Sequence, residues 1–282
     1  VEKPLAMTNR EANELIELAN KKGLLLSAAP STILSQTNQI VKQLIDKDAI
    51  GTICFSRAHG SHQGAAWSPF WTTDPSWFFK KGSGPLYDMG VYQFHLMTYL
   101  MGPAKKVTAM SRLAIPVREI RSGPAKGKVV EGDVDDCTLL IMEMANGSFS
   151  VVDATFCVRS YKGPTVEIYG SGGTININRE QPRLEVYQDD HDTNISGWRI
   201  PWQKGPDTYR LARGVEHVAT ALIEKRAPLV TAEHAAHVVE LMEKAYISAE
   251  TGQTMRIESS FSSTYSLRVW EEIGANKQRS LV

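Results

Sequence analysis

The sequence lacks the glycine-rich fingerprint by which a Rossmann fold binds a dinucleotide. That fingerprint, Gly-x-Gly-x-x-Gly, stands between a strand and a helix because the helix N-terminus holds the pyrophosphate. The nearest segment, residues 170–173, follows a strand-like stretch at 165–169 and precedes a second strand pattern at 174–178. We therefore predict a hairpin turn at 170–173 and no phosphate site.

The chain also lacks net charge, paired cysteines and long apolar runs. Lys+Arg and Asp+Glu both count 31, which argues against a broad nucleic-acid footprint or a polybasic membrane face. No apolar run has the length of a membrane span, and the first residues do not resemble a signal peptide. Cys54, Cys137 and Cys157 lie in strand-like apolar stretches without paired spacing. We predict buried thiols in a reducing, cytoplasmic compartment.

The first thirty residues have the pattern of a parallel α/β sheet. Thr8 and Glu11 form a capping box that predicts a helix ending at Gly23. Residues 24–28 are a short, continuous apolar run closed by Pro30, which is typical of a strand buried on both faces.

The rest of the chain predicts an open, largely antiparallel sheet of about six or more strands with helices on one face. Asn146-Gly147 between two apolar strands is a strong hairpin signal. We expect residues 118–136, which hold several glycines and charges, to be a mobile connection, and the tail after Ser259 to be irregular. Strands are predicted at 52–56, 107–112, 137–144, 148–154, 165–169, 173–177 and 183–188, and helices at 36–47, 208–225 and 232–250.

Two distant segments carry the side chains that proton transfer on an alcohol needs. Lys3 lies at the start of the chain, and residues 84–95 form a glycine-containing loop that runs into a helix. Asp88, Tyr92, His95 and Tyr99 are spaced i, i+4, i+7 and i+11, which places them on one face of a helix. A face that carries titratable groups such as Asp88, Tyr92 and His95 favours a site, and the alternative is a partly buried helix with satisfied polar groups.

Together the two segments resemble the glucose–fructose oxidoreductase and inositol dehydrogenase family (Gfo/Idh/MocA). Members carry a Glu-Lys-Pro turn, matched by residues 2–4, and a Gly-Gly-x-Leu-x-Asp-x-Gly-x-His or -Tyr loop. The order of elements also matches from Val1 to about Ile257. The second motif is matched by Gly84, Leu86, Asp88, Gly90 and Tyr92.

The resemblance implies an NAD(P)-dependent oxidoreductase in which Lys3 binds the reacting oxygen and Tyr92 donates and accepts the proton. Relatives with His at the place of Tyr92 use that His as acid/base, so the Tyr puts the identity of the acid/base in doubt. Asp88 would orient Tyr92 or Lys3 or bind a substrate hydroxyl, and His95 is a second candidate for substrate contact. Glu2, Lys3 and Pro4 would lie at the cofactor.

An aromatic-rich loop follows the first strand of the sheet. His59 and His62 precede Trp71 and Trp77, and aromatic rings beside polar groups are the usual lining of a sugar or polyol pocket. The alternative is an arm that packs on a neighbouring subunit.

Two clusters could suggest a metal, but neither has the pattern of a known site. Asp133, Asp135 and Asp136 lie on alternate positions leading into a strand, where we expect solvent exposure. His234 and His237 are spaced i, i+3 on a helix that we expect to be partly exposed, and no third ligand is visible. We predict no metal.

The resemblance thus divides the chain into a remnant of a dinucleotide-binding domain (residues 1–30), a substrate-binding and dimerisation α+β domain (31–258) and a tail (259–282). We expect the catalytic part of an NAD- or NADP-dependent enzyme acting on the CH–OH group of a sugar or polyol, and a homodimer or tetramer formed through the sheet. We also expect this chain alone to be inactive, because it lacks the dinucleotide fingerprint. The alternative is a non-enzymatic sheet module that assembles with itself or a partner.

Overall fold

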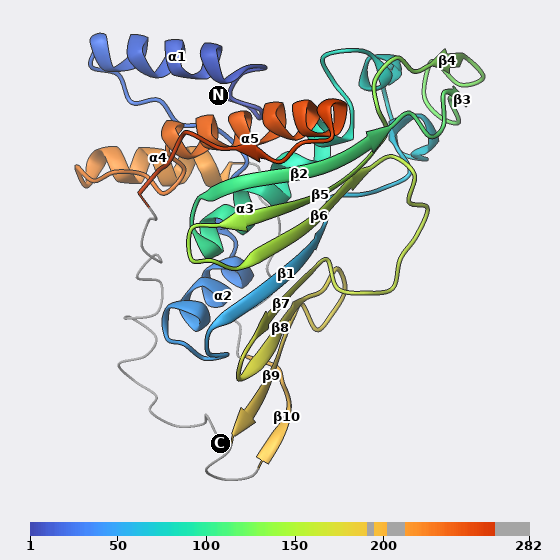
Figure 1. Cartoon of the computed structure of the whole chain (residues 1–282). Coiled ribbons are helices and arrows are strands. Elements are labelled where there is room, and N and C mark those ends of the chain that lie inside the picture. Colours follow the sequence, from blue (N-terminus) through green and yellow to red (C-terminus); the bar gives the residue numbers. More distant parts are fainter. Residues whose placement is uncertain (191–194, 202–211, 263–282) are drawn as a thin grey trace.

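A computed structural model describes residues 1–190, 195–201 and 212–262. Its centre is a curved sheet with helices against one face (Figure 1). Within these residues the sheet has nine strands in the order β10-β9-β8-β7-β1-β6-β5-β2-β11. Neighbouring strands are antiparallel except β1 and β6, which are parallel. The predicted open, largely antiparallel sheet is therefore confirmed.

Most strands begin or end within a few residues of the predicted positions. The hairpin between β5 and β6 has Gly147 at φ 87°, as the Asn-Gly signal predicts. Residues 170–173 form the turn between β7 and β8, so the predicted hairpin is confirmed. The strands are β1 (Ile53–His59), β2 (Ala104–Arg112), β5 (Cys137–Met144), β6 (Phe149–Thr155), β7 (Val166–Gly170), β8 (Gly173–Ile177), β9 (Leu184–Asp190), β10 (Ile195–Arg199) and β11 (Met255–Arg256).

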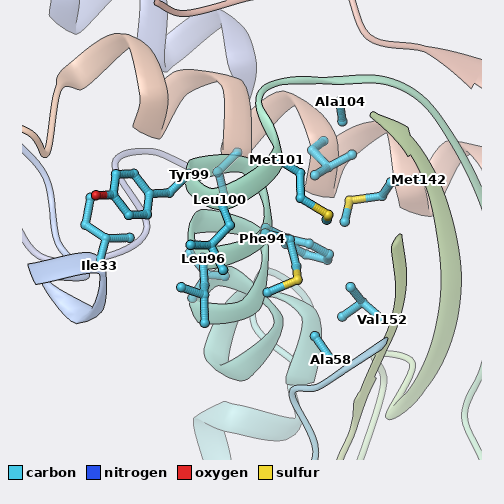
Figure 2. Packing of buried hydrophobic residues seen from close by; sticks show 14 of the residues in the cluster. Ile33, Ala58, Phe94, Leu96, Tyr99, Leu100, Met101, Ala104, Met142 and Val152 are labelled. Atoms are coloured by element: carbon cyan, nitrogen blue, oxygen red, sulfur yellow. The ribbon is translucent and has the colours of Figure 1, made fainter. Parts of the chain in front are cut away.

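The helix α3 (Val91–Met101) is the centre of the core, with Tyr92 as its only residue that is not buried. A helix that is apolar on all sides needs neighbours on all sides. On one side Phe94 and Met101 pack against Met142 and Val152 of the sheet, and on the other Tyr99 reaches towards Ile33 (Figure 2). The helix that begins with the candidate site is thereby held rigidly.

Helices α1 (Asn9–Lys21), α2 (Gln36–Asp46) and α5 (Ala232–Thr251) confirm three predictions. The capping box of Thr8 and Glu11 is present, and Gly252 ends α5 in the left-handed conformation. The helix predicted at 208–225 is α4 (Arg213–Ile223), and residues 208–211 lie outside the described part. The sequence also predicts an apolar stripe of Leu211, Val215, Val218 and Leu222 on this helix. Leu211 lies outside the described part, and the stripe is wrong for Val215 and Leu222, which are exposed.

The buried strand predicted at 24–28 is wrong. These residues are assigned to no strand. The amino group of Val1 donates to Ser27 O, and the N–H of Ala29 donates to the Val1 carbonyl. Leu24 and Leu25 are exposed, since no described strand or helix covers them. A short apolar run is buried only where other elements pack on it, and the run itself does not determine which elements those are.

Residues 118–136 are not a simple connection. They contain part of a two-stranded sheet of β3 (Val117–Glu119) and β4 (Val129–Glu131) that covers a second, smaller core with the aromatic loop. Arg118 and Asp136 form a buried ion pair beneath it, at 2.6 Å, which corrects the prediction that Asp136 faces solvent. Asp136 also accepts the N–H groups of Ala114 and Ile115.

The predicted burial of the three cysteines is wrong. Cys54 is exposed, and Cys137 and Cys157 are only partly buried. All three are free thiols. In an open sheet, alternate residues of an apolar strand point to the uncovered face, so an apolar sequence environment does not guarantee burial.

The uncovered face of the sheet carries a continuous apolar patch over β2, β5 and β6. Met110 lies opposite Leu139, and Ile141 lies opposite Val151. Together with Phe149, these side chains are between 38% and 79% exposed. Isolated apolar residues are normal on a protein surface, but a contiguous patch marks a surface that another molecule can cover.

We predict that Asp136→Ala destabilises the fold by about 3–5 kcal/mol, because the guanidinium of Arg118 then stays buried without its counter-charge. Chemical denaturation followed by circular dichroism measures the loss. Asp133→Ala is the control, because this aspartate is half exposed and pairs with Lys80 at the surface. Equal losses in the two variants would contradict the importance of the buried pair.

Candidate active site

Lys3 joins the N-terminal segment to the start of α3. Its Nζ donates to the backbone carbonyl of Asp88 at 2.7 Å and to Asp88 Oδ1 at 3.0 Å. The two side chains are 16% and 17% exposed, so the pair is shielded from bulk water without being sealed from it. The structure therefore brings together two groups that lie 85 residues apart.

A wide helical turn presents Asp88 to Lys3. Leu86–Gly90 form a π-helical turn that leads directly into α3. Gly84 precedes it at φ 95°, a conformation that favours glycine, and Gly90 packs so closely on Ala154 and Phe94 that a side chain there would be within 3.1 Å of both. The glycines of the motif thus set the loop geometry and the approach of the turn to the sheet.

His62 is a member of the site that the sequence did not single out as a site residue. Its Nε2 is 3.6 Å from Asp88 Oδ2, and its Nδ1 accepts the N–H of Gly64 at 2.8 Å. Because Nδ1 is an acceptor, the proton of the neutral ring is on Nε2 and faces the carboxylate. The hint in the sequence was the position of His62 just after the first strand of the sheet.

The electrostatics of the site favour an ionised Asp88. Burial by itself raises the pKa of this carboxyl, but the hydrogen bonds and charges of His62 and Lys3 outweigh it and lower the pKa below its usual value. Asp88 is therefore a carboxylate that holds the Lys3 ammonium in place and orients the His62 ring.

Tyr92 completes the arrangement on the other side of Lys3. The Lys3 Nζ lies 4.9 Å from the centroid of the Tyr92 ring, within the range of a cation–π contact. Tyr92 is one residue into α3 and is partly exposed. Lysine, carboxylate, phenol and imidazole thus meet at one end of the sheet, as the motif predicted for the first three.

His95 and Tyr99 lie in a different environment from Asp88 and Tyr92. His95 is 2% exposed and its ring centroid is 4.8 Å from that of His234. Burial, together with the charge of His237, lowers the pKa of His95 to about 3. Tyr99 accepts a hydrogen bond from Gln39 in the core. Both residues are buried because α3 is covered on nearly every side, so they do not form one exposed polar face with Tyr92.

His234 and His237 are buried, which corrects the expectation of a partly exposed helix. His234 Nε2 lies 2.7 Å from Thr98 Oγ1, and His237 Nε2 accepts the N–H of Ala104 at 3.0 Å. The described residues contain no group of three metal-binding side chains. The two histidines connect α5 to α3 and β2.

The remaining predicted residues occupy two places. His59 lies on the uncovered face of the sheet with its Nδ1 2.8 Å from Asp153 Oδ1, and this hydrogen bond raises its pKa despite partial burial. Trp71 and Trp77 both pack on Phe78 in the second core, and Trp77 is 58% exposed. The structure does not gather these three residues around Lys3.

The turn at residues 170–173 does not fit the pyrophosphate of a dinucleotide. A side chain at Gly170 would lie 2.1 Å from Ile50 O, and one at Gly173 would lie 2.2 Å from Tyr187 O. These glycines permit close backbone packing at a strand turn that leads into β8 and not into a helix.

Comparison with known proteins relates the central part of the chain to a family. Residues 38–176 match the model of the GFO/IDH/MocA C-terminal domain. The matched segment runs from within α2 into β8 and includes the Asp88 turn, whereas Lys3 lies outside it.

Relatives of this family are named dehydrogenases. Levoglucosan dehydrogenase of Pseudarthrobacter phenanthrenivorans is 31% identical over 200 residues, which are 64% of this chain and 49% of that protein. D-glucoside 3-dehydrogenase of Escherichia coli K12 is 22% identical over 91% of this chain and 71% of that protein. The chain thus spans about half the length of the levoglucosan dehydrogenase and a larger share of the D-glucoside 3-dehydrogenase.

Solved structures show the same fold. An NAD-binding oxidoreductase from Klebsiella pneumoniae superposes with a TM-score of 0.78 at 18% identity, covering 92% of this chain and 73% of the other. A levoglucosan dehydrogenase in complex with NADH and L-sorbose superposes with a TM-score of 0.76 at 23% identity, covering 92% of this chain and 72% of the other.

Among the residues that the structure describes, no helix combines the length and the apolar composition that a membrane span needs.

We predict that Lys3→Met raises the pKa of Asp88, because it removes a hydrogen bond and a positive charge while the burial remains. Carbon-13 NMR of the aspartate carboxyls measures this pKa. In the wild type the lowered pKa stabilises the fold at pH values above about 4. This contribution to the free energy of unfolding is lost as the pH falls through the pKa of Asp88 in the folded state. Because the pKa of Asp88 is higher in the variant, the variant should lose less stability over the same pH range. Lys80→Met, which removes the exposed partner of Asp133, should leave the Asp88 titration unchanged.

Proposed function

We propose that this chain is the catalytic and substrate-binding part of an NAD(P)-dependent oxidoreductase that acts on the CH–OH group of a sugar or polyol. The observation that carries the proposal is the Lys3 ammonium, held between the Asp88 carboxylate and the Tyr92 ring. A purely structural ion pair has no need of a phenol beside it at the partly exposed end of a buried helix.

The hydrogen bonds of Lys3 leave it equipped to hold a substrate oxygen. An ammonium has three donors, and two of them reach Asp88. The third can donate to the hydroxyl of the substrate and stabilise negative charge on that oxygen as its proton leaves. Asp88 fixes the direction of the ammonium, and the Nε2–H of His62 helps to fix the carboxylate.

In this proposal the phenolate form of Tyr92 accepts the hydroxyl proton during oxidation, and the phenol returns it during reduction. A bound nicotinamide would supply the acceptor for the hydride of the carbinol carbon. Since His95 is buried against His234, the proposal gives it a packing role and leaves the acid/base role to Tyr92. Glu2, Lys3 and Pro4 would face the cofactor side of the site.

The proposal extends to the organisation of the protein. We propose that residues 1–30 belong to a dinucleotide-binding domain, with residues 31–258 as the substrate domain, and that the enzyme works in the cytoplasm. The exposed Leu24 and Leu25 support the first point, because they offer the apolar surface that the rest of such a domain would cover. NADH in related structures favours NAD, and NADP stays an alternative.

We predict that Lys3→Ala and Tyr92→Phe, in the polypeptide that joins this chain to a dinucleotide-binding domain, each lower kcat by about a hundredfold to ten-thousandfold. Both side chains act on the proton, so cofactor affinity should change little. Reduction of NAD and NADP, followed at the nicotinamide absorbance with a panel of sugars and polyols, measures kcat.

The control for this prediction is His95→Asn. If His95 only packs, this variant should keep most of kcat once folding is verified. Near-normal turnover of Tyr92→Phe together with a loss of turnover in His95→Asn would assign the acid/base to His95 and contradict the role of Tyr92.

We propose further that two copies of the chain associate through the apolar patch on the uncovered sheet face. The patch supports a second function, that of an assembly module, which is compatible with the enzymatic one. A contiguous apolar surface over three neighbouring strands is costly to leave in water. A second copy would cover it by pairing the same patch across a two-fold axis.

We predict that the chain sediments as a dimer, or a multiple of it, at micromolar concentration, and that Ile141→Glu shifts it towards the monomer. The charge would be buried without a partner at the centre of the contact. Ile223→Glu is the control, because Ile223 is 82% exposed on α4 and away from the patch. A monomeric wild type would contradict the proposed contact.

A further inference from the structure

Three guanidinium groups surround the ring of Trp67. The Cζ atoms of Arg118, Arg121 and Arg159 lie 5.3, 4.9 and 4.0 Å from the ring centroid. Arg118 is buried and neutralised by Asp136. Arg121 and Arg159 are exposed, and within residues 1–190, 195–201 and 212–262 neither forms an ion pair with a carboxylate. Because both contact one ring, their guanidiniums are no more than about 9 Å apart.

The arrangement is fixed by the backbone and not only by flexible side chains. The N–H of Arg121 donates to Ala66 O at 2.8 Å, and Ser122 Oγ donates to Ser68 O at 2.5 Å. The two acceptors flank Trp67 in the sequence, so these bonds hold the segment after β3 beside Trp67. Trp67 itself packs on the second core. Two positive charges are therefore brought close together by the fold.

This cluster borders the candidate active site. Val158, the neighbour of Arg159, donates its N–H to His62 O at 3.3 Å. The backbone N–H of Trp67 donates to Gly64 O at 3.2 Å, and the backbone N–H of Gly64 donates to His62 Nδ1 at 2.8 Å. His62 in turn faces Asp88. Arg159 thus follows a residue that is bonded directly to His62, and Arg121 is bonded to Ala66, in the segment that begins with the Gly64–His62 bond.

The local charge favours an anionic partner. Lys3 is neutralised by Asp88 and Arg118 by Asp136, whereas among the residues that the structure describes no carboxylate forms an ion pair with Arg121 or Arg159. A neutral sugar has no group that compensates them. A carboxylate or phosphate does, because its oxygens match the fork of N–H groups on each guanidinium.

We propose that Arg121 and Arg159 bind an anionic group of the substrate, so that the substrate class is a sugar acid or a sugar phosphate. This inference rests on the proposed function, which it narrows from sugars and polyols in general. The two arginines act in recognition only, and the reacting carbon is held at Lys3 and Tyr92.

Isothermal titration calorimetry on the 282-residue chain tests the inference with four ligands: D-glucuronate, D-glucose 6-phosphate, D-glucose and inorganic phosphate. We expect one of the two anionic sugars to bind at least about tenfold more tightly than D-glucose, which corresponds to about 1.4 kcal/mol. The preferred one identifies the carboxylate or the phosphate as the recognised group. Added NaCl should weaken this binding and leave that of D-glucose unchanged.

Arg121→Gln and Arg159→Gln should each reduce the preference for the anionic sugar towards that of D-glucose. Both residues are exposed, so the variants should keep the circular dichroism of the wild type. Arg10→Gln is the matched control, because it removes an exposed arginine on α1 and should keep the preference.

Three results would overturn the inference: no binding of either anionic sugar, equal binding of D-glucose, or binding of inorganic phosphate as tight as that of the sugar. Lys3→Ala separates this inference from the proposed function. It removes a hydrogen bond to a hydroxyl that anionic and neutral sugars share, so both affinities can fall together while the preference in calorimetry should remain. Anionic sugars that bind but are never oxidised would refute the proposed function alone. Oxidation of neutral and anionic sugars at equal kcat/KM would refute the anion preference alone.

Discussion

The pair formed by Lys3 and Asp88 is the contact on which the organisation of the site depends. Its two hydrogen bonds reach both the side chain and the carbonyl of Asp88, so they fix the N-terminal segment to a particular backbone turn. Partial burial makes the pair sensitive to loss of either partner, because the remaining charge would be poorly solvated. The hydrogen bonds between Val1 and residues 27–29 also hold the first residue of the chain against the end of the N-terminal segment.

The rigidity of that contact comes from α3. A helix buried on nearly every side cannot shift without opening the core on both its faces, as Figure 2 makes clear for Phe94 and Tyr99. The π-helical turn at its N-terminus then presents Asp88 outward while the residues that follow return to the interior. Reactive groups at the site therefore rest on the best-packed element of the chain, which is where positional precision is easiest to keep.

Much of the fold and part of the site could be predicted from the sequence, for identifiable reasons. The capping box at Thr8, the Asn-Gly turn at 146–147 and the glycine after α5 are local signals whose geometry does not depend on distant parts. Lys3, Asp88 and Tyr92 were found through a motif. Burial was harder, because it depends on neighbours that a local pattern does not name. Leu24 and Cys54 are exposed, whereas His234 and Asp136 are buried. His62 was missed as a site residue for the same reason, since its role follows from Asp88 lying opposite.

The parallel pairing of β1 with β6 has a consequence for how the chain folds. β1 is a central strand, yet its partners β6 and β7 follow roughly a hundred residues later in the sequence. Bringing the ends of so long a segment together costs chain entropy before the hydrogen bonds between the strands form. This cost slows folding in proteins that are rich in distant contacts. During synthesis β1 emerges well before its partners and stays unpaired in the meantime. Its polar residues Ser56, Arg57 and His59 then serve a second purpose, since they lower the tendency of a waiting strand to pair with another chain.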